Sequence, residues 1–144
     1  MTDITLERHI NASPEHVFSF FTSSERWSEW QGRATTIEPM VGGVYRMTAP
    51  NGGVASGVVL ELIPHRLIVF TWGWEDHPTV PPGSSTVRIE LEPAEGKTIV
   101  TLTHSGLPSD ETGLHRMGWD HYLARLEAIA SGDDPGPDSG LDAT

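Results

Sequence analysis

Residues 109–130 read SDETGLHRMGWDHYLARLEAIA, and this stretch decides the fold because it predicts one long amphipathic helix. Its apolar side chains recur at three- and four-residue spacing, which gathers them on one face of a helix. These positions are Trp119, Tyr122, Leu123, Leu126, Ile129 and Ala130. Asp120, Arg125 and Glu127 take the other face. A helix with such a face must bury it against a large partner surface, so we expect a sheet beside it.

The segments before this helix predict an antiparallel sheet. Residues 4–10 alternate polar and apolar side chains, and six further strand-like runs follow, with turn signals between them. The six runs cover residues 35–38, 44–48, 56–63, 66–74, 86–92 and 98–104. The strongest turn signal is Pro50-Asn51-Gly52-Gly53, which is typical of a tight hairpin.

Two short helices are expected between the first strand and the remaining strands. Ser13, Pro14 and Glu15 supply a cap, a first-turn proline and an acid at the positive helix end. A second helix begins near Ser23 or Ser24. This order predicts an α+β helix-grip fold, in which a curved antiparallel sheet of six to seven strands surrounds the C-terminal helix. Pockets commonly form at such a junction.

The composition indicates one soluble domain. Residues 1–130 are expected to form it, whereas residues 131–144 are rich in Gly, Pro, Asp and Ser and predict a disordered tail. The 20 acidic and 9 basic residues give a net charge of -11, which disfavours nucleic acids and anionic membranes. Cysteine is absent, which excludes disulfides and thiolate catalysis. No secretory or membrane-spanning segment is visible, so we expect a cytoplasmic location.

Several motifs follow one another in an order that is specific for a fold. They are RHINASPEHVF at residues 8–18, GGVYR at 42–46, PHRLIVFTW at 64–72, KTIVTLTH at 97–104 and GWDHYLARL at 118–126. Together they resemble the START-like or Bet v 1-like (SRPBCC) helix-grip superfamily over residues 3–130, and within it the group named for the activator of Hsp90 ATPase. The resemblance implies a cavity between sheet and helix, which different members use for lipids, hormones, polyketides or other apolar molecules. The eukaryotic namesake stimulates a chaperone ATPase and carries an additional N-terminal domain.

Aromatic side chains are expected to face this space. Period-two alternation places Phe70, Trp72 and Trp74 on one face of their strand, where they either fill a core or line a pocket. Met117 adds an adaptable side chain. The candidate ligand-binding residues are Tyr45, Met47, Phe70, Trp72, Trp74, His104, His115 and Trp119.

Two histidines are expected beside the same space. By strand parity His104 points inward, and His115 lies four residues before Trp119 on the helix. They could be buried hydrogen-bonded side chains, anchors for a ligand, or a general base. A metal site is not expected, because His115 and His121 lie six residues apart and face different sides of the helix. Gly118 indicates either close packing of the helix on the sheet or room for a ligand.

The sequence therefore favours binding of a small apolar, aromatic or lipid-like molecule, without a cofactor, over catalysis. One alternative is a cyclase or aromatase that uses His104 or His115 as acid or base. Another is a chaperone-interacting protein or stress-response regulator. Nucleic-acid binding and membrane insertion are not expected, and both a monomer and a homodimer remain open.

Overall fold

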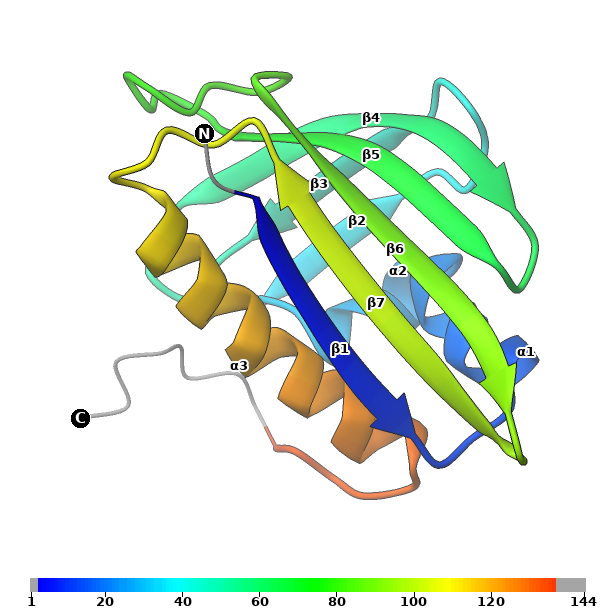
Figure 1. Cartoon of the computed structure of the whole chain (residues 1–144). Coiled ribbons are helices and arrows are strands. Elements are labelled where there is room, and N and C mark those ends of the chain that lie inside the picture. Colours follow the sequence, from blue (N-terminus) through cyan, green and yellow to red (C-terminus); the bar gives the residue numbers. More distant parts are fainter. Residues whose placement is uncertain (1–2, 137–144) are drawn as a thin grey trace.

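The computed structural model describes residues 3–136, which form a seven-stranded antiparallel sheet around one long helix (Figure 1). The strands are β1 (Ile4–Ile10), β2 (Ala34–Ile37), β3 (Val44–Thr48), β4 (Val54–Ile63), β5 (Leu67–Trp74), β6 (Ser85–Ala94) and β7 (Lys97–Ser105). The helices are α1 (Pro14–Phe18), the 3-10 turn η1 (Ser19–Phe21), α2 (Ser24–Ser28) and α3 (Thr112–Ala130). The strand order is β1-β7-β6-β5-β4-β3-β2, and the α+β helix-grip prediction is confirmed.

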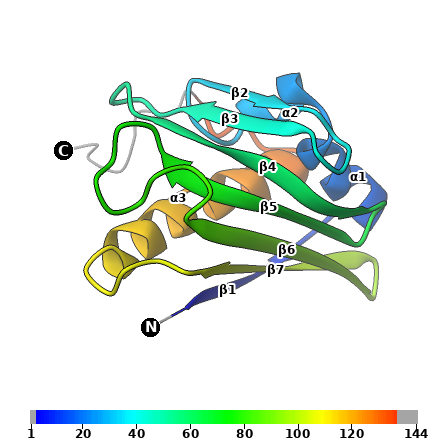
Figure 2. The ribbon, with the colours of Figure 1, turned by 90° about the horizontal axis from the view of Figure 1, so that it is seen from above.

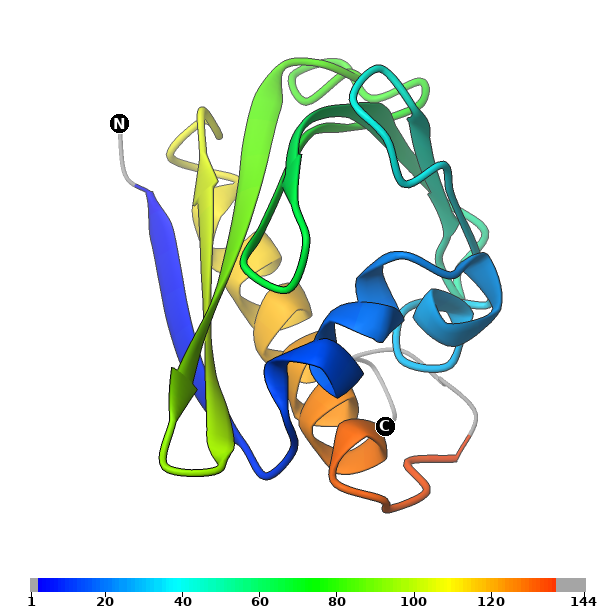
Figure 3. The same cartoon turned by 90° about the vertical axis from the view of Figure 1, so that its right-hand side faces the viewer.

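The sheet bends so that α3 lies on its concave side. In Figure 3, β1 and β7 stand on one side of α3 while β2 and β3 stand on the other. Figure 2 shows α3 running beneath the strands. A register shift between Val59 and Glu61 in β4 marks a bulge, which bends the strand locally.

The two short helices begin at the caps that the sequence predicts. The Ser13 hydroxyl accepts from the His16 backbone N–H at 3.2 Å, and the Ser23 hydroxyl accepts from the Arg26 backbone N–H at 3.3 Å. The long helix begins three residues later than predicted, at Thr112. Before it, the Pro108 carbonyl accepts from the Glu111 backbone N–H at 3.0 Å, so the chain makes a turn there first.

An aromatic cluster fills the end of the fold beneath α1 and α2. The rings of Trp27 and Trp30 stack with centroids 5.5 Å apart, and Phe21 meets Trp27 edge-on at 5.3 Å. Tyr45 and Phe70 extend the cluster onto the sheet, with ring centroids 4.5 Å apart. All five side chains are fully buried. This end of the space between sheet and helix is therefore solid.

The segment after α3 is held against the domain by one arginine. The Arg125 guanidinium donates to the carbonyls of Glu29 and Trp30, both at 3.2 Å, and to that of Gly136 at 2.8 Å. Arg125 thereby links Gly136 to the residues that follow α2. The rest of the predicted disordered tail lies outside the described residues.

The loop after β5 folds back onto its own strand. Trp74 donates its backbone N–H to the Val80 carbonyl at 2.6 Å. A Cβ on Gly73 would lie only 1.8 Å from the Pro81 carbonyl oxygen, so this close approach requires glycine. The loop therefore sits beside the C-terminal end of β5, at the open end of the space between sheet and helix.

Candidate functional site

A cleft with a volume of about 910 Å³ opens between the sheet and the first half of α3. Small-molecule sites commonly have volumes of roughly 300–1,000 Å³. Its walls come from the end of β5 and the loop after it, the turn between β3 and β4, the segment after α2, and α3. The lining residues are Gln31, Arg33, Ala49, Pro50, Asn51, Gly53, Val54, Trp72, Trp74, Glu75, Asp76, His77, Pro78, Glu111, Leu114, His115, Gly118, Trp119 and Tyr122.

The structure divides the eight candidate residues into two sets. The four that line the cleft are Trp72, Trp74, His115 and Trp119. The four that lie buried behind its lining are Tyr45, Met47, Phe70 and His104. The alternation along a strand correctly predicts which side chains point inward. It does not predict which of these side chains reach the cleft and which lie buried behind its lining. The expectation that Met117 faces this space is wrong: it lies two residues from Trp119, on the far side of the helix, and is 57% exposed.

Several lining residues are absent from the sequence-based candidates. Gln31 and Arg33 lie in an irregular segment, where no periodic pattern indicates direction. The loop residues Glu75 and His77 also belong to no periodic pattern, so the sequence does not indicate where their side chains point. Tyr122 is different, because its spacing of three from Trp119 already places it on the same helix face.

Trp72 occupies the centre of the aromatic wall. Its ring centroid lies 5.1 Å from that of Trp119, 5.5 Å from that of Trp74 and 5.8 Å from that of Tyr45. These separations are typical of favourable tilted and edge-on aromatic pairs. Three of the five tryptophans of the chain thus form one continuous surface along the cleft.

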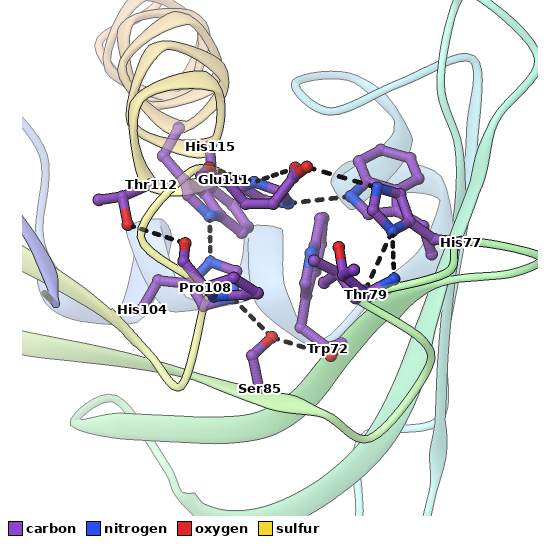
Figure 4. Close-up of polar contacts among 12 residues, drawn as sticks. Trp72, His77, Thr79, Ser85, His104, Pro108, Glu111, Thr112 and His115 are labelled. Carbon is purple, nitrogen blue, oxygen red and sulfur yellow. Dashed lines mark hydrogen bonds and ion pairs between the residues drawn. The ribbon is translucent and has the colours of Figure 1, made fainter. Parts of the chain in front are cut away.

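His104 holds the Trp119 indole from behind this wall. Trp119 Nε1 donates to His104 Nδ1 at 2.9 Å, so that nitrogen carries no proton. His104 Nε2–H then donates to Ser85 Oγ at 2.9 Å, and the Ser85 hydroxyl donates to the Trp72 carbonyl at 2.9 Å (Figure 4). Burial, with a smaller contribution from nearby His115, lowers the pKa of His104 to about 3. The imidazole is therefore neutral, and both of its nitrogens are engaged.

His115 holds the Trp74 indole in the same manner. Trp74 Nε1 donates to His115 Nε2 at 2.9 Å, and His115 Nδ1–H donates to the Glu111 carbonyl at 2.8 Å. Burial lowers the pKa of His115, which favours this neutral form. Because both ring nitrogens are engaged, neither is available to take a proton from a bound molecule. The two histidines thus position indoles.

The Glu111 carboxylate joins α3 to the loop after β5. Its two oxygens lie 3.7 Å from His115 Nδ1 and 3.7 Å from His77 Nε2 (Figure 4). His77 Nδ1 accepts from the backbone N–H groups of Thr79 and Val80 at 3.1 and 3.0 Å, so its proton resides on Nε2 and points to Glu111. These contacts fix the loop at the mouth of the cleft.

Two buried donors in the lining have no acceptor among residues 3–136. They are the Gln31 amide nitrogen, Nε2, and the Trp72 indole nitrogen, Nε1. The Gln31 and Trp72 side chains are 0% and 2% exposed, respectively. Unpaired buried donors are rare in folded proteins, because each costs about 1–3 kcal/mol. Both belong to residues that line the cleft.

Gly118 forms part of the helix side of the cleft. A Cβ built on it would meet no atom within 4 Å. Close packing of the helix on the sheet, one of the two explanations drawn from the sequence, is therefore wrong. The glycine instead leaves space in the cleft.

The mouth of the cleft is acidic. Among the lining residues, Glu75, Asp76 and Glu111 contribute carboxylates and Arg33 contributes a guanidinium, and the Glu75 carboxylate is paired with Arg46 Nε at 3.3 Å. Within residues 3–136, no group of three or more histidine, aspartate or glutamate side chains is arranged to hold a metal ion. In the same part of the chain, no helix combines the length and apolar character needed to cross a membrane.

The fold and the cleft define a helix-grip domain with an aromatic-walled cleft under its C-terminal helix. Residues 11–131 match the family model described as Activator of Hsp90 ATPase homolog 1-like protein. The chain belongs to this family.

One curated protein and two solved structures are similar to this chain. The human Activator of 90 kDa heat shock protein ATPase homolog 1 is 28% identical over 119 residues, covering 83% of this chain but 34% of the human protein, so the chain spans about one third of that relative's length. The AHSA1-like protein from Rhizobium etli, solved by NMR, is 40% identical, with a TM-score of 0.75 over 95% of this chain and 86% of that chain. The Aha1 dimer from Colwellia psychrerythraea shares the fold, with 22% identity and a TM-score of 0.81 over 92% of this chain and 98% of that one.

Proposed function

We propose that this domain binds a small, predominantly aromatic or apolar molecule in the cleft between the sheet and α3. The observation that carries the proposal is the cleft of about 910 Å³ walled by Trp72, Trp74 and Trp119. A wall of three indoles offers a ligand a large apolar surface together with favourable ring-to-ring contacts.

The wall is organised before any ligand arrives. His104 and His115 each accept a hydrogen bond from an indole, and Trp72 lies between the rings so held. A rigid wall loses little conformational entropy on binding, which favours affinity. At about -0.3 kcal/mol per non-hydrogen atom, a ligand of about 25 such atoms gains roughly -7.5 kcal/mol, corresponding to low-micromolar affinity.

Acid–base catalysis, as in a cyclase or aromatase, has less support. His104 lies behind the lining, and His115 uses both ring nitrogens within the protein. A general base must present a free nitrogen within hydrogen-bond reach of its substrate. The histidines are therefore better suited to hold the walls of a binding site.

The proposal is tested with Nile red, a neutral dye of about 24 non-hydrogen atoms, for which the same efficiency gives a Kd of about 5 μM. Its emission should rise on titration with the wild-type domain. The variant Gly118→Phe places a ring in the cleft and should weaken binding at least tenfold.

Gly113→Phe is the matched control. Gly113 lies on the same helix, is exposed, has no atom within 4 Å of a Cβ, and lies outside the cleft lining. It should bind the dye as the wild type does, while thermal melts check that both variants fold. Equal binding by both variants, or no emission change with the wild type at 100 μM protein, contradicts the proposal.

Membership of the family suggests an alternative function, which is interaction with a chaperone. The same variants distinguish this function from ligand binding in the cleft. The ATPase rate of a purified Hsp90-type chaperone is measured with the wild-type domain and with Gly118→Phe. Stimulation that the cleft-filling variant leaves unchanged would assign a chaperone activity to another surface.

A further inference from the structure

The contacts of Gln31 fix the orientation of its amide. Its carbonyl oxygen accepts from Trp27 Nε1 at 2.7 Å and from the Tyr45 hydroxyl at 2.8 Å. An indole nitrogen only donates, so the reversed amide would set an NH₂ group against the Trp27 N–H. Burial raises the pKa of Tyr45, which keeps its hydroxyl protonated as a donor. The Gln31 NH₂ group is therefore the end that remains to donate, and it has no partner among residues 3–136.

Trp72 supplies a second donor in the lining of the cleft. Its indole nitrogen is buried and has no partner among the described residues, although the Trp74 and Trp119 indoles each have a histidine acceptor. Tyr45 connects the two free donors, because its hydroxyl bonds to Gln31 while its ring packs 5.8 Å from that of Trp72. Gln31 and Trp72 both line the cleft.

We infer that the cleft selects aromatic molecules that carry a neutral carbonyl-type acceptor, recognised by the Gln31 amide N–H and the Trp72 indole N–H; this inference rests on the proposed function. An acceptor bound there satisfies donors that otherwise cost free energy. An anionic carboxylate is disfavoured, because the buried donors are uncharged and the mouth carries Glu75, Asp76 and Glu111.

The test uses three naphthalenes of similar shape. 2-Acetylnaphthalene presents a carbonyl, 2-isopropenylnaphthalene replaces its oxygen by CH₂, and 2-naphthoate presents a carboxylate. Affinities are measured by ligand-observed NMR titration with the wild-type domain. The ketone should bind about tenfold more tightly than the alkene, as expected for two neutral hydrogen bonds. It should also bind at least tenfold more tightly than the carboxylate.

Two variants remove one donor each. Trp72→Phe keeps an aromatic ring without an N–H, and Gln31→Glu keeps the oxygen that accepts from Trp27 and Tyr45 while replacing the NH₂ group. Each should reduce the ketone-to-alkene ratio to about threefold, because a change in the apolar wall affects both probes alike and cancels in the ratio, whereas the loss of a donor affects only the ketone. A ratio that stays near ten in both folded variants overturns the inference.

A second measurement needs no variant. In the wild-type domain the Trp72 Nε1–H resonance should move downfield with the ketone, as it gains an acceptor, and should not do so with the alkene. Identical behaviour with both probes overturns the inference but leaves the proposed function standing, because both probes then bind without recognition of the oxygen. Binding of none of the three probes would contradict the proposed function itself.

Discussion

Acidification should destabilise the domain through His104. This imidazole is fully buried and its pKa is lowered to about 3, whereas histidine in an unfolded chain titrates near 6.5. Between these values the folded imidazole stays neutral and the unfolded one is protonated, so unfolding takes up a proton. The contribution to stability is therefore complete above about pH 6.5 and decreases as the pH falls towards about 3.

The size of the effect follows from the same two values. One unit of pKa difference corresponds to about 1.4 kcal/mol, so between pH 7 and pH 5 this group lowers the free energy of unfolding by about 2 kcal/mol. His115, whose pKa burial also lowers, acts in the same direction. The variant His104→Asn retains a side-chain oxygen that can accept from Trp119 but cannot titrate. Its stability should fall by about 2 kcal/mol less over this interval.

Urea unfolding followed by tryptophan emission at pH 7, 6 and 5 measures the difference. His16→Asn, the same substitution at an exposed histidine, is the control and should follow the wild type. If His104→Asn and the wild type lose the same free energy between pH 7 and pH 5, the neutral, hydrogen-bonded state assigned to His104 is refuted.

Three further substitutions test other parts of the structure. Gly118→Ala should raise the free energy of unfolding by about 0.5–1 kcal/mol in urea titrations, because the methyl group meets no neighbour and alanine favours a helix; a loss would show that the helix is closer to the sheet. Gly73→Ala should lower the free energy of unfolding by about 2 kcal/mol or more, because its Cβ would collide with the Pro81 carbonyl; a neutral effect would contradict the loop position. Arg125→Met should make residues 131–136 at least tenfold more sensitive to limited proteolysis, because Arg125 bonds to the Gly136 carbonyl; unchanged cleavage would contradict that attachment.

Much of the fold follows from local patterns in the sequence. Alternation gives the inward direction of Phe70 and Trp72, and the serine caps at Ser13 and Ser23 give the starts of the short helices. These signals involve residues that are close in sequence, so they can be interpreted without knowledge of the rest of the fold. The start of α3 is less accurate, because the turn at Pro108 precedes it.

The site is only partly predictable from the sequence. Contacts between elements that are distant in sequence decide whether an inward-facing side chain lines the cleft or lies buried behind the lining. Tyr45 and Phe70 point inward like Trp72, yet the ring of Trp27 packs against both of them and they fill the solid end of the core. Trp74 and His115 lie 41 positions apart, and no local pattern indicates their hydrogen bond. The polar lining is a property of the assembled fold.

Small aromatic molecules should bind in the tryptophan-walled cleft. The indole N–H signals of the five tryptophans, followed in ¹H–¹⁵N spectra during titration with 2-acetylnaphthalene, test this expectation most directly. The signals of Trp72, Trp74 and Trp119 should shift in a saturable way, while that of Trp30, which is buried outside the cleft lining and donates to the Phe20 carbonyl, stays in place. A saturable shift confined to Trp30, or no saturable shift in any of the five, would contradict binding in the cleft.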